Sequence, residues 1–333
     1  RLYFGERKTG QDSRKWNSLP RNSTFRLRGM KMRHAFLIIA HNNWWQLKQL
    51  IQLLDAENHD IYVHIDKKSK SFSEEDFLNL TAKSKVYFFQ EYEVFWGGFS
   101  QVQVELFLFE KAYQQKYDYY HLVSGADLPL KSNRKIDTFF EKNQGKEFIL
   151  YDNEKLLNDP EISRRTRYYH YLQNYRRRDS QKWKNEFFTF LERASLVMQI
   201  ALHVNRVKNL DWTVKYGSQW VSITNDLVEE LLKQKDKITK VFSCTNCADE
   251  LFVQTVAYNC GFNDKIYCPE DGMAENVRFI DWTRGKNGNP YTFRNQDYQS
   301  LKTNKNLFAR KFSESVDKEI IQRICSEIQD EDI

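Results

Sequence analysis

Short apolar runs alternate with segments of helical spacing along the first 125 residues, and this alternation constrains the fold more than any other feature of the chain. The run HAFLIIAH at 34–41 has the length of a buried parallel strand, and apolar side chains then recur at helical spacing over 42–54. Further strand-like runs lie at 61–66, 86–89 and 119–124, and a second helical stretch lies at 99–115. Strands and helices in alternation predict an α/β fold with a right-handed, mostly parallel sheet.

Polar residues stand where these expected strands end. His41 and Asp66 close the first two runs, and Asp127 follows the fourth run after a Gly-Ala pair. Ligands of open α/β sheets bind outside the carboxyl ends of the strands. We therefore expect a binding site at this edge of the sheet, near these three residues.

The rest of the chain is less regular but long enough to complete one large domain. We expect a short strand at 220–223, helices at 226–234 and 249–258, a loop-like stretch at 281–307 and a closing helix at 315–329. The domain is expected to span 32–315, with a C-terminal helix and tail at 316–333. Residues 1–31 are basic, polar and unpatterned, and we expect a disordered leader or tag there.

A basic segment at 164–193 interleaves Arg and Lys with Tyr and Trp. A nucleic-acid site has this composition, and so does an amphipathic helix on an anionic membrane. A pair of solvated basic helices is the plainer interpretation. The net charge of +6 over 333 residues suits an anionic ligand or surface and does not decide between these possibilities.

Cysteine spacing and hydropathy bear on the compartment. Cys244 and Cys247 form a C-x-x-C pair, but Cys260 and Cys268 are too far apart in the chain to complete a zinc site of usual spacing, so we expect reduced structural thiols. No apolar segment has the length of a membrane span or the pattern of a signal peptide. We expect a cytoplasmic protein, peripheral on the inner face of the membrane if 164–193 binds lipid.

Seven motifs follow one another in a specific order: HAFLIIAHNN, IYVHIDKKS, FWGGFSQV, YYHLVSGADLPLKS, YGSQWVSIT, CADELFVQT and NLFARKFS. Each motif is weak alone, whereas the order and spacing of the whole set are specific. Over residues 33–313 the set resembles the core-2/I-branching glycosyltransferases (glycosyltransferase family 14), which include β-1,6-N-acetylglucosaminyltransferases and peptide O-xylosyltransferases. The WGG turn, the SGADLPLKS loop and the FARKF ending look closest to xylosyltransferases and bacterial-type members.

This resemblance implies one GT-A-like domain with a Rossmann-like nucleotide-binding half, a UDP-sugar donor and inversion at the anomeric carbon. It also implies that no metal ion or other cofactor is required and that the chain has no Asp-x-Asp motif. UDP leaves with growing negative charge, so fixed cationic side chains must stabilise it in place of a metal. Arg310 and Lys311 match the family's basic diphosphate clamp, and Arg284 and Arg294 are weaker candidates.

The resemblance also implies a general base. Glu250, in CADELFVQT, matches the family's catalytic carboxylate, and a single carboxylate suffices for one-step inversion. Asp249 is the rival, because a shift of one residue in the match would exchange the two. An acidic residue that only stabilises the start of a helix is the plainer interpretation of either.

Six further residues are implied to contact the donor: His41, Asp66, Trp96, Gly97, Asp127 and Trp220. Asp66 matches a family position at the nucleoside, where a carboxylate can accept from uracil N–H or ribose hydroxyls. Gly97 belongs to the WGG turn, where a missing side chain allows close approach to the donor. His64 points the same way along its strand as Asp66 and has a structural alternative.

The resulting hypothesis is a transferase that moves GlcNAc or xylose from a UDP-sugar to a hydroxyl of a glycan or lipid-linked oligosaccharide. Peripheral membrane contact through 164–193 is part of this hypothesis, and nucleic acid is not an expected partner. The alternative is a membrane- or nucleic-acid-binding module without turnover. A dinucleotide-dependent oxidoreductase is rejected, because HNNWWQ stands where a G-x-G-x-x-G motif would be needed.

Overall fold

The computed structural model of the chain describes residues 31–173, 175, 182–269, 272–286 and 288–332. The expected leader or tag at 1–31 therefore falls almost entirely outside the described residues. So does part of the basic segment, including Arg176 and Arg177.

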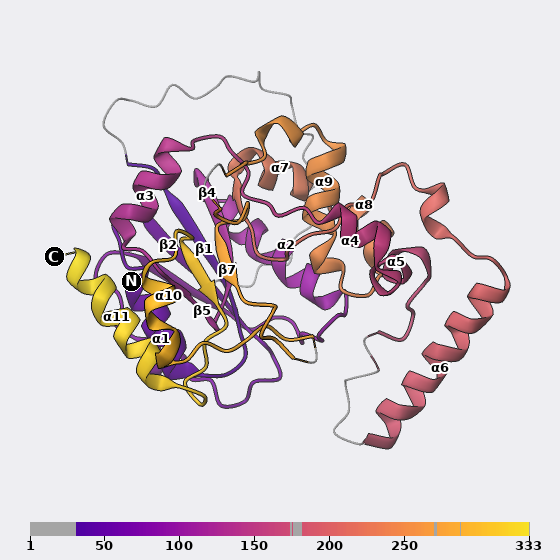
Figure 1. Cartoon of the computed structure of the whole chain (residues 1–333), viewed down its shortest axis with the longest axis horizontal. Helices are drawn as coiled ribbons and strands as arrows, with labels where there is room; N and C mark the ends of the chain where they lie inside the picture. Colours follow the sequence, from indigo (N-terminus) through magenta and orange to yellow (C-terminus); the bar gives the residue numbers. More distant parts are fainter. Residues whose placement is uncertain (1–30, 174, 176–181, 270–271, 287, 333) are drawn as a thin grey trace, which may run out of the picture.

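A five-stranded sheet forms the centre of the molecule, in the order β3-β2-β1-β4-β6 (Figure 1). The first four strands run parallel, and the short edge strand is antiparallel to β4. They are β1 (His34–Ala40), β2 (His59–Ile65), β3 (Lys85–Phe89), β4 (Tyr119–Ser124) and β6 (Ser222–Thr224). The predicted α/β class and Rossmann-like, GT-A-like arrangement are confirmed.

Both faces of this sheet are covered, because side chains of β1 alternate between two apolar clusters. Ala35 and Leu37 pack with α2 (Ser100–Tyr113), α7 (Asn225–Lys233), α8 (Lys235–Phe242) and α9 (Phe252–Asn259). Phe36 and Ile38 pack on the other side with α1 (Trp44–Leu53), α3 (Asn133–Lys142), α10 (Tyr298–Lys302) and α11 (Lys318–Asp332). Coverage on both faces explains why the strand sequences are continuously apolar rather than alternating.

A second, three-stranded sheet has the order β5-β8-β7 and was not predicted from the sequence. It consists of β5 (Asp127–Pro129), β7 (Arg278–Ile280) and β8 (Phe308–Arg310). The stretch expected to be loop-like at 281–307 holds a 3₁₀ turn (Asn295–Asp297) followed by α10. Because β5 and β8 are antiparallel neighbours, this sheet brings the SGADLP loop against the FARKF motif.

The expected helix at 249–258 begins later than the sequence suggests. Cys247 has a left-handed backbone (φ 50°), a 3₁₀ turn spans Ala248–Glu250, and Leu251 is non-helical before α9 starts. Asp249 and Glu250 therefore precede the helix and do not occupy its first turn, so the helix-start interpretation of these acids is wrong.

The remaining elements are short, apart from one long helix. They are α4 (Asn153–Asn158), α5 (Pro160–Arg167), α6 (Lys182–Ala201) and 3₁₀ turns at Glu74–Phe77, Arg206–Asn209 and Asn263–Lys265. Figure 1 shows α6 standing at the periphery, away from the central sheet. Among the residues described, no helix is both long and apolar enough to cross a bilayer.

Candidate active site

Arg310 is fixed at the centre of the predicted site by an ion pair. It faces Asp127 directly across the antiparallel pair of β5 and β8, and its Nη1 lies 2.8 Å from Asp127 Oδ1. The same nitrogen donates to Ser124 Oγ, which in turn donates to Asp127 Oδ1 at 2.7 Å. The Asp127 carboxylate is almost fully buried. The acid and the hydroxyl thus hold the guanidinium in one orientation.

Trp220 and Lys311 flank this guanidinium. The Arg310 Cζ lies 4.4 Å from the centroid of the Trp220 ring, a cation–π contact. Burial, followed by the neighbouring charge of Arg310, lowers the pKa of Lys311. Two cations thus stand side by side with one carboxylate between them, and an anion placed there would relieve their repulsion.

The charges that act on His41 show that several of the predicted residues lie close together. Its pKa is lowered chiefly by burial, while the charge of Asp66 acts in the opposite direction and those of Lys311, Lys68 and Arg310 lower it further. Charges at two different strand ends therefore act on one imidazole. The structure brings His41, Asp66, Arg310 and Lys311 to the same edge of the sheet.

Asp66 is held by the loop that follows β2. Its Oδ1 accepts from the backbone N–H of Lys68 at 2.9 Å, and its Oδ2 lies 3.4 Å from Lys68 Nζ. His64 lies two residues earlier, in β2. Its Nε2 accepts from Tyr92 N–H at 3.1 Å, and burial lowers the pKa of His64 to about 4. His64 is therefore neutral and supports the loop, whereas Asp66 lies at the strand end.

The WGG turn packs against the CADEL loop. Gly97 has φ +74°, and its carbonyl accepts from Cys247 N–H at 2.8 Å. A Cβ on Gly97 would lie 2.9 Å from Asn246 Oδ1, so this glycine allows a close approach between two protein segments. Trp96, beside it, is 57% exposed. The donor contact expected of Gly97 stays a prediction.

Glu250 pairs with an arginine from the basic segment. Its Oε2 lies 2.7 Å from Arg165 Nη1, and both side chains are partly exposed. An ion pair at an accessible carboxylate holds it in one orientation. Arg165 lies in α5, so the basic segment contributes one of its charges to the predicted site rather than only to the surface.

Asp249 points the other way, into the protein. Its Oδ2 accepts from Gln101 Nε2 at 3.0 Å, while Gln101 Oε1 accepts from Gly97 N–H at 2.5 Å. Burial, and then the charge of Glu250, raises the pKa of Asp249 to about 7. Glu105, fully buried nearby, has its pKa raised well above the usual range by burial and by Asp249. The less accessible acid is thus the one suited to position the loop.

A single turn, Gly217–Trp220, connects the predicted base to the predicted clamp. Gly217 donates its N–H to the carbonyl of Glu250 at 2.9 Å, and three residues later Trp220 lies against Arg310. A Cβ on Gly217 would fall 1.7 Å from the carbonyl oxygen of Leu150, so only glycine fits. Three residues span at most about 11 Å, so this segment keeps the CADEL loop and the Trp220 ring near each other.

Several contributors escaped the sequence reasoning. Ser124, Lys68, Arg165 and Gln101 hold predicted residues in place, yet only their position beside a quoted motif or in the basic segment could have drawn attention to them. Of the two weaker clamp candidates, Arg284 pairs with Asp281 and Asp297 (2.6 Å each), and Arg294 donates its backbone N–H to Asp297.

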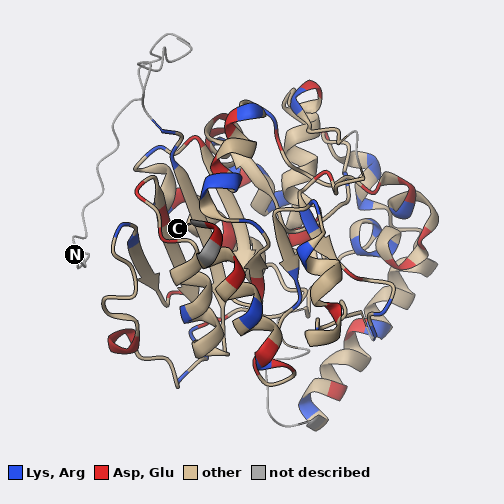
Figure 2. Cartoon of the chain, turned by 60° about the vertical axis from the view of Figure 1, so that its left-hand side comes forward, with Lys and Arg blue, Asp and Glu red and all other residues tan. Residues whose placement is uncertain are grey.

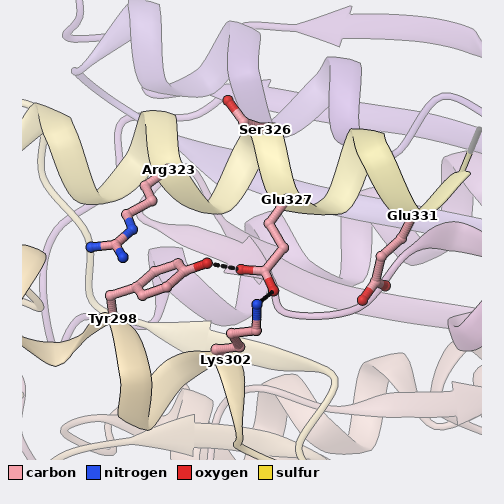
Figure 3. A pocket seen from close by; sticks show the side chains of 6 residues that line it. All are labelled: Tyr298, Lys302, Arg323, Ser326, Glu327 and Glu331. Carbon is pink, nitrogen blue, oxygen red and sulfur yellow. Dashed lines mark hydrogen bonds and ion pairs between the residues drawn. The ribbon is translucent and has the colours of Figure 1, made fainter.

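Two further features lie outside this site. An Asp-x-Asp sequence occurs at 330–332 in the last turn of α11, so the expectation that the chain has none is wrong; this sequence lies outside the seven motifs. A hollow between α10 and α11 is lined by Tyr298, Lys302, Arg323, Ser326, Glu327 and Glu331 (Figure 3). Lys302 Nζ lies 2.7 Å from Glu327, while Glu331 pairs with Lys135 outside the hollow at 2.8 Å. The lining contains none of the predicted site residues.

Comparison with known proteins places the chain among enzymes of one kind. A family model described as "Branch: Core-2/I-Branching enzyme" matches residues 34–305. Xylosyltransferase 2 of Mus musculus is 23% identical over 331 residues, which cover 88% of this chain and 33% of the relative. Xylosyltransferase sqv-6 of Caenorhabditis briggsae is 25% identical over 313 residues, with coverages of 83% and 34%. The chain spans about a third of the length of the curated relatives it matches.

Solved structures resemble the chain only distantly. Mouse xyloside xylosyltransferase 1 in its apo form has a TM-score of 0.36 and 11% identity, covering 83% of this chain and 96% of the other. Core-mannan synthase A from Aspergillus fumigatus, in an Mn/GDP form, has a TM-score of 0.34 and 12% identity, with coverages of 73% and 79%. Scores this low carry no inference about this chain.

Proposed function

The chain belongs to the Core-2/I-branching enzyme family, and from that premise we propose that it is an inverting, metal-independent transferase acting on a UDP-sugar. The resemblance inferred from the seven motifs and the glycosyltransferase class are confirmed by the family match. The observation that carries the proposed mechanism is the turn Gly217–Trp220, which contacts both Glu250 and Arg310. This segment connects the loop of the proposed base with the proposed clamp, which supports placing both in one active site.

Arg310 and Lys311 would stabilise the departing UDP. As the bond between the anomeric carbon and the diphosphate oxygen breaks, negative charge grows on the β-phosphate. A guanidinium already held by Asp127 and Ser124 needs little rearrangement to meet that charge, which is the condition for strong electrostatic stabilisation. The neighbouring ammonium adds a second charge-assisted donor.

Glu250 would accept the proton of the acceptor hydroxyl as its oxygen attacks the anomeric carbon. One bond forms and one breaks in a single displacement, so the configuration inverts and UDP leaves from the opposite face. The accessible carboxylate suits this role better than the buried Asp249, because an acceptor must reach it. Arg165 holds the Glu250 carboxylate in position before the acceptor arrives.

Donor and acceptor follow from the family and the relatives' names. We propose UDP-xylose or UDP-GlcNAc as donor, with the xylosyltransferase relatives favouring the first, and a glycan or lipid-linked oligosaccharide as acceptor. Incubation with a panel of UDP-sugars in the presence of EDTA, read out as UDP release, tests this proposal. Release from one donor supports it, whereas release only after addition of manganese contradicts the metal-independent mechanism.

A peripheral contact with the inner face of a membrane completes the proposal, and α6 supports it. Glu192 and Gln199, on one face of α6, bond to His170 and Tyr169 of the preceding segment. The opposite face exposes large apolar side chains at helical spacing: Trp183, Phe187, Phe190, Val197 and Met198 are each 52–66% exposed. The helix thus turns polar groups inward and apolar ones outward, as an interfacial helix does.

Charge and composition favour lipid over nucleic acid at this surface. Figure 2 shows α6 mostly free of charged residues, whereas a nucleic-acid site needs a dense basic face. Arg164 and Arg167, both exposed on α5, provide the positive charge that would meet anionic lipid. A cytoplasmic location, peripheral on the membrane, is proposed on the same ground.

A further inference from the structure

Two histidines and an aspartate meet at the amino-terminal edge of the central sheet, opposite the edge that holds Arg310. His34 begins β1, His59 begins β2, and the two residues face each other in the parallel register. Asp137, from α3, approaches both. Sequence reasoning attached no role to any of the three, and the proposed sugar transfer makes no use of them.

Their ligand-type atoms lie close together. His59 Nε2 is 2.8 Å and His34 Nε2 is 3.5 Å from the same oxygen, Asp137 Oδ1. One ligand atom from each residue lies within 4.8 Å of the others. In a tetrahedral zinc site with bonds of about 2.0–2.2 Å, ligand atoms are about 3.3 Å apart. The two measured separations bracket that value.

The hydrogen bonds of His59 fix its tautomer. Its Nδ1 lies 3.0 Å from the carbonyl oxygen of Leu54, which can only accept, so Nδ1 carries a proton. A neutral His59 then turns the lone pair of Nε2 toward the carboxylate of Asp137 at 2.8 Å. Two electron-rich atoms at that distance need a cation between them. That cation is either a second proton on His59 or a metal ion.

Hydrogen-bond partners around the cluster fix the orientation of each of the three residues. Metal ligands in proteins are oriented by hydrogen bonds in the same way. His34 Nδ1 lies 2.9 Å from His121 Nε2, and His121 Nδ1 lies 2.8 Å from Ser222 Oγ. With His121 in the tautomer that donates its Nδ1–H to Ser222, His34 donates its own Nδ1–H to His121 and directs its Nε2 toward Asp137. Asn58 Nδ2 donates to Asp137 Oδ2 at 2.9 Å and leaves Oδ1 to the two histidines. Each residue thus presents one atom to a common point.

An apolar, aromatic shell encloses the two imidazoles. The rings of Tyr119 and Phe140 pack against His34, and that of Phe36 packs against His59, with centroids 5.0–6.2 Å apart. Both histidine side chains are completely buried, whereas the Asp137 side chain is 19% exposed. The carboxylate side therefore offers the path by which an ion and a water molecule reach the cluster.

We propose that His34, His59 and Asp137 form a structural metal site that takes a divalent zinc ion, with water as the fourth ligand. Two imidazole nitrogens and one carboxylate are a ligand set that zinc prefers. The ion joins β1, β2 and α3, so its role is to stabilise the fold rather than to take part in sugar transfer. The site stands apart from the proposed function and does not rest on it.

The test uses the full chain. Metal content of the purified protein is measured by elemental analysis after dialysis against chelator and reconstitution with zinc, and the thermal midpoint Tm is recorded with and without the ion. We expect about one zinc per chain and an increase in Tm of several degrees on reconstitution, because an ion that binds only the folded state stabilises it. Reconstitution with cobalt should give the visible absorption of a tetrahedral site without a thiolate charge-transfer band.

Variants then locate the ion. Asp137→Asn keeps the size of the ligand and removes its charge, and it should lose the bound zinc and the Tm increase. His203→Asn replaces an exposed histidine as the matched control and should keep both. Equal zinc binding by Asp137→Asn, or a thiolate band with cobalt, would place the ion elsewhere and overturn the proposal. So would an unchanged Tm in the parent chain, which would assign the cation to a second proton on His59.

Discussion

Arg310 and Asp127 face each other across two short antiparallel strands, with Nη1 and Oδ1 2.8 Å apart. The pair is separated by 183 residues in sequence, and it makes the orientation of the guanidinium a property of the fold. Asp127 provides one negative charge beside two adjacent cations, Arg310 and Lys311. The two cations therefore retain affinity for an anion.

Replacing either cation should weaken donor binding. A charge-assisted hydrogen bond is worth about 1.5–3 kcal/mol, so Arg310→Ala or Lys311→Ala should reduce UDP affinity and turnover by roughly ten- to hundred-fold. Calorimetric titration with UDP and steady-state kinetics measure the two effects. Arg323→Ala and Lys302→Ala, in the hollow between α10 and α11, are matched controls and should leave both unchanged. Unaltered kinetics in both variants would mean that Arg310 and Lys311 do not bind the donor.

UDP should bind without a divalent ion at the reacting centre. The two cations and their fixed geometry provide the charge that a metal supplies elsewhere. Titration of the protein with UDP in EDTA is therefore expected to give the same affinity as titration with manganese. Binding seen only with manganese would contradict the mechanism. The zinc proposed at the opposite edge of the sheet does not affect this comparison, since its loss should change Tm and not UDP affinity.

Glu250→Gln should separate chemistry from donor binding. The substitution keeps size and hydrogen bonding but removes the basic oxygen, so turnover should fall by about 10²–10⁴-fold with UDP affinity nearly unchanged. Measurements of kcat, KM and UDP affinity on the same preparation test this split. Arg165→Ala is the companion variant, and it should lower turnover more than UDP affinity, because it removes the partner that orients Glu250. Near-normal transfer by Glu250→Gln would mean that the base lies elsewhere.

Asp249 should make stability depend on pH. Its pKa in the folded chain is about 7, above the value near 3.9 of an unfolded Asp, so the folded state holds the extra proton between these limits. The free energy of unfolding should therefore fall as pH rises from about 4 to about 7. Urea unfolding at a series of pH values measures this slope.

Asp249→Asn should make that slope less steep, because the amide cannot ionise, while the buried Glu105 continues to contribute to it. Asp264→Asn, at an exposed position, is the control and should leave the slope as it is in the parent chain. Equal slopes in parent and Asp249→Asn would show that ionisation of Asp249 does not cost stability. Loss of transfer in Asp249→Asn, with normal transfer in Glu250→Gln, would instead exchange the two roles.

The outward face of α6 should bind anionic membranes. Flotation with liposomes is expected to recover the protein when anionic lipid is present and to lose it at high salt or with Phe187→Ser and Phe190→Ser together. Leu157→Ser, at an exposed apolar residue of α4, is the matched control and should float like the parent. Tight binding of DNA or RNA without lipid binding would overturn the membrane contact.

Local pattern was enough to predict the central sheet. The runs at 34–41 and 119–124 are long and continuously apolar, and both appear as strands within one residue of the expected ends. The three-residue strands β5, β7 and β8 are not set off by such runs, so their sheet was missed. The contact between the SGADLP loop and the FARKF motif, which this sheet creates, was therefore missed as well.

The candidate site was predictable only in part, for a related reason. Motifs pointed to Glu250, Asp127 and Arg310, but the partners that orient them come from distant segments. Arg165, which pairs with Glu250, lies in the basic segment at 164–193. Nothing in the sequence distinguishes it from the neighbouring arginines. The non-helical backbone of Leu251 separates Asp249 and Glu250 from α9, and helical spacing alone cannot reveal it.

The outward-facing apolar side of α6 also bears on how the enzyme would encounter its acceptor. A protein docked through that helix diffuses laterally, so it searches for membrane-borne acceptors in two dimensions. The rate of transfer would then depend on the surface density of the acceptor. It would fall when inert lipid dilutes the acceptor within the membrane at constant bulk concentration. A short soluble acceptor would not show this dilution, even though the reacting groups at Glu250 and Arg310 are the same.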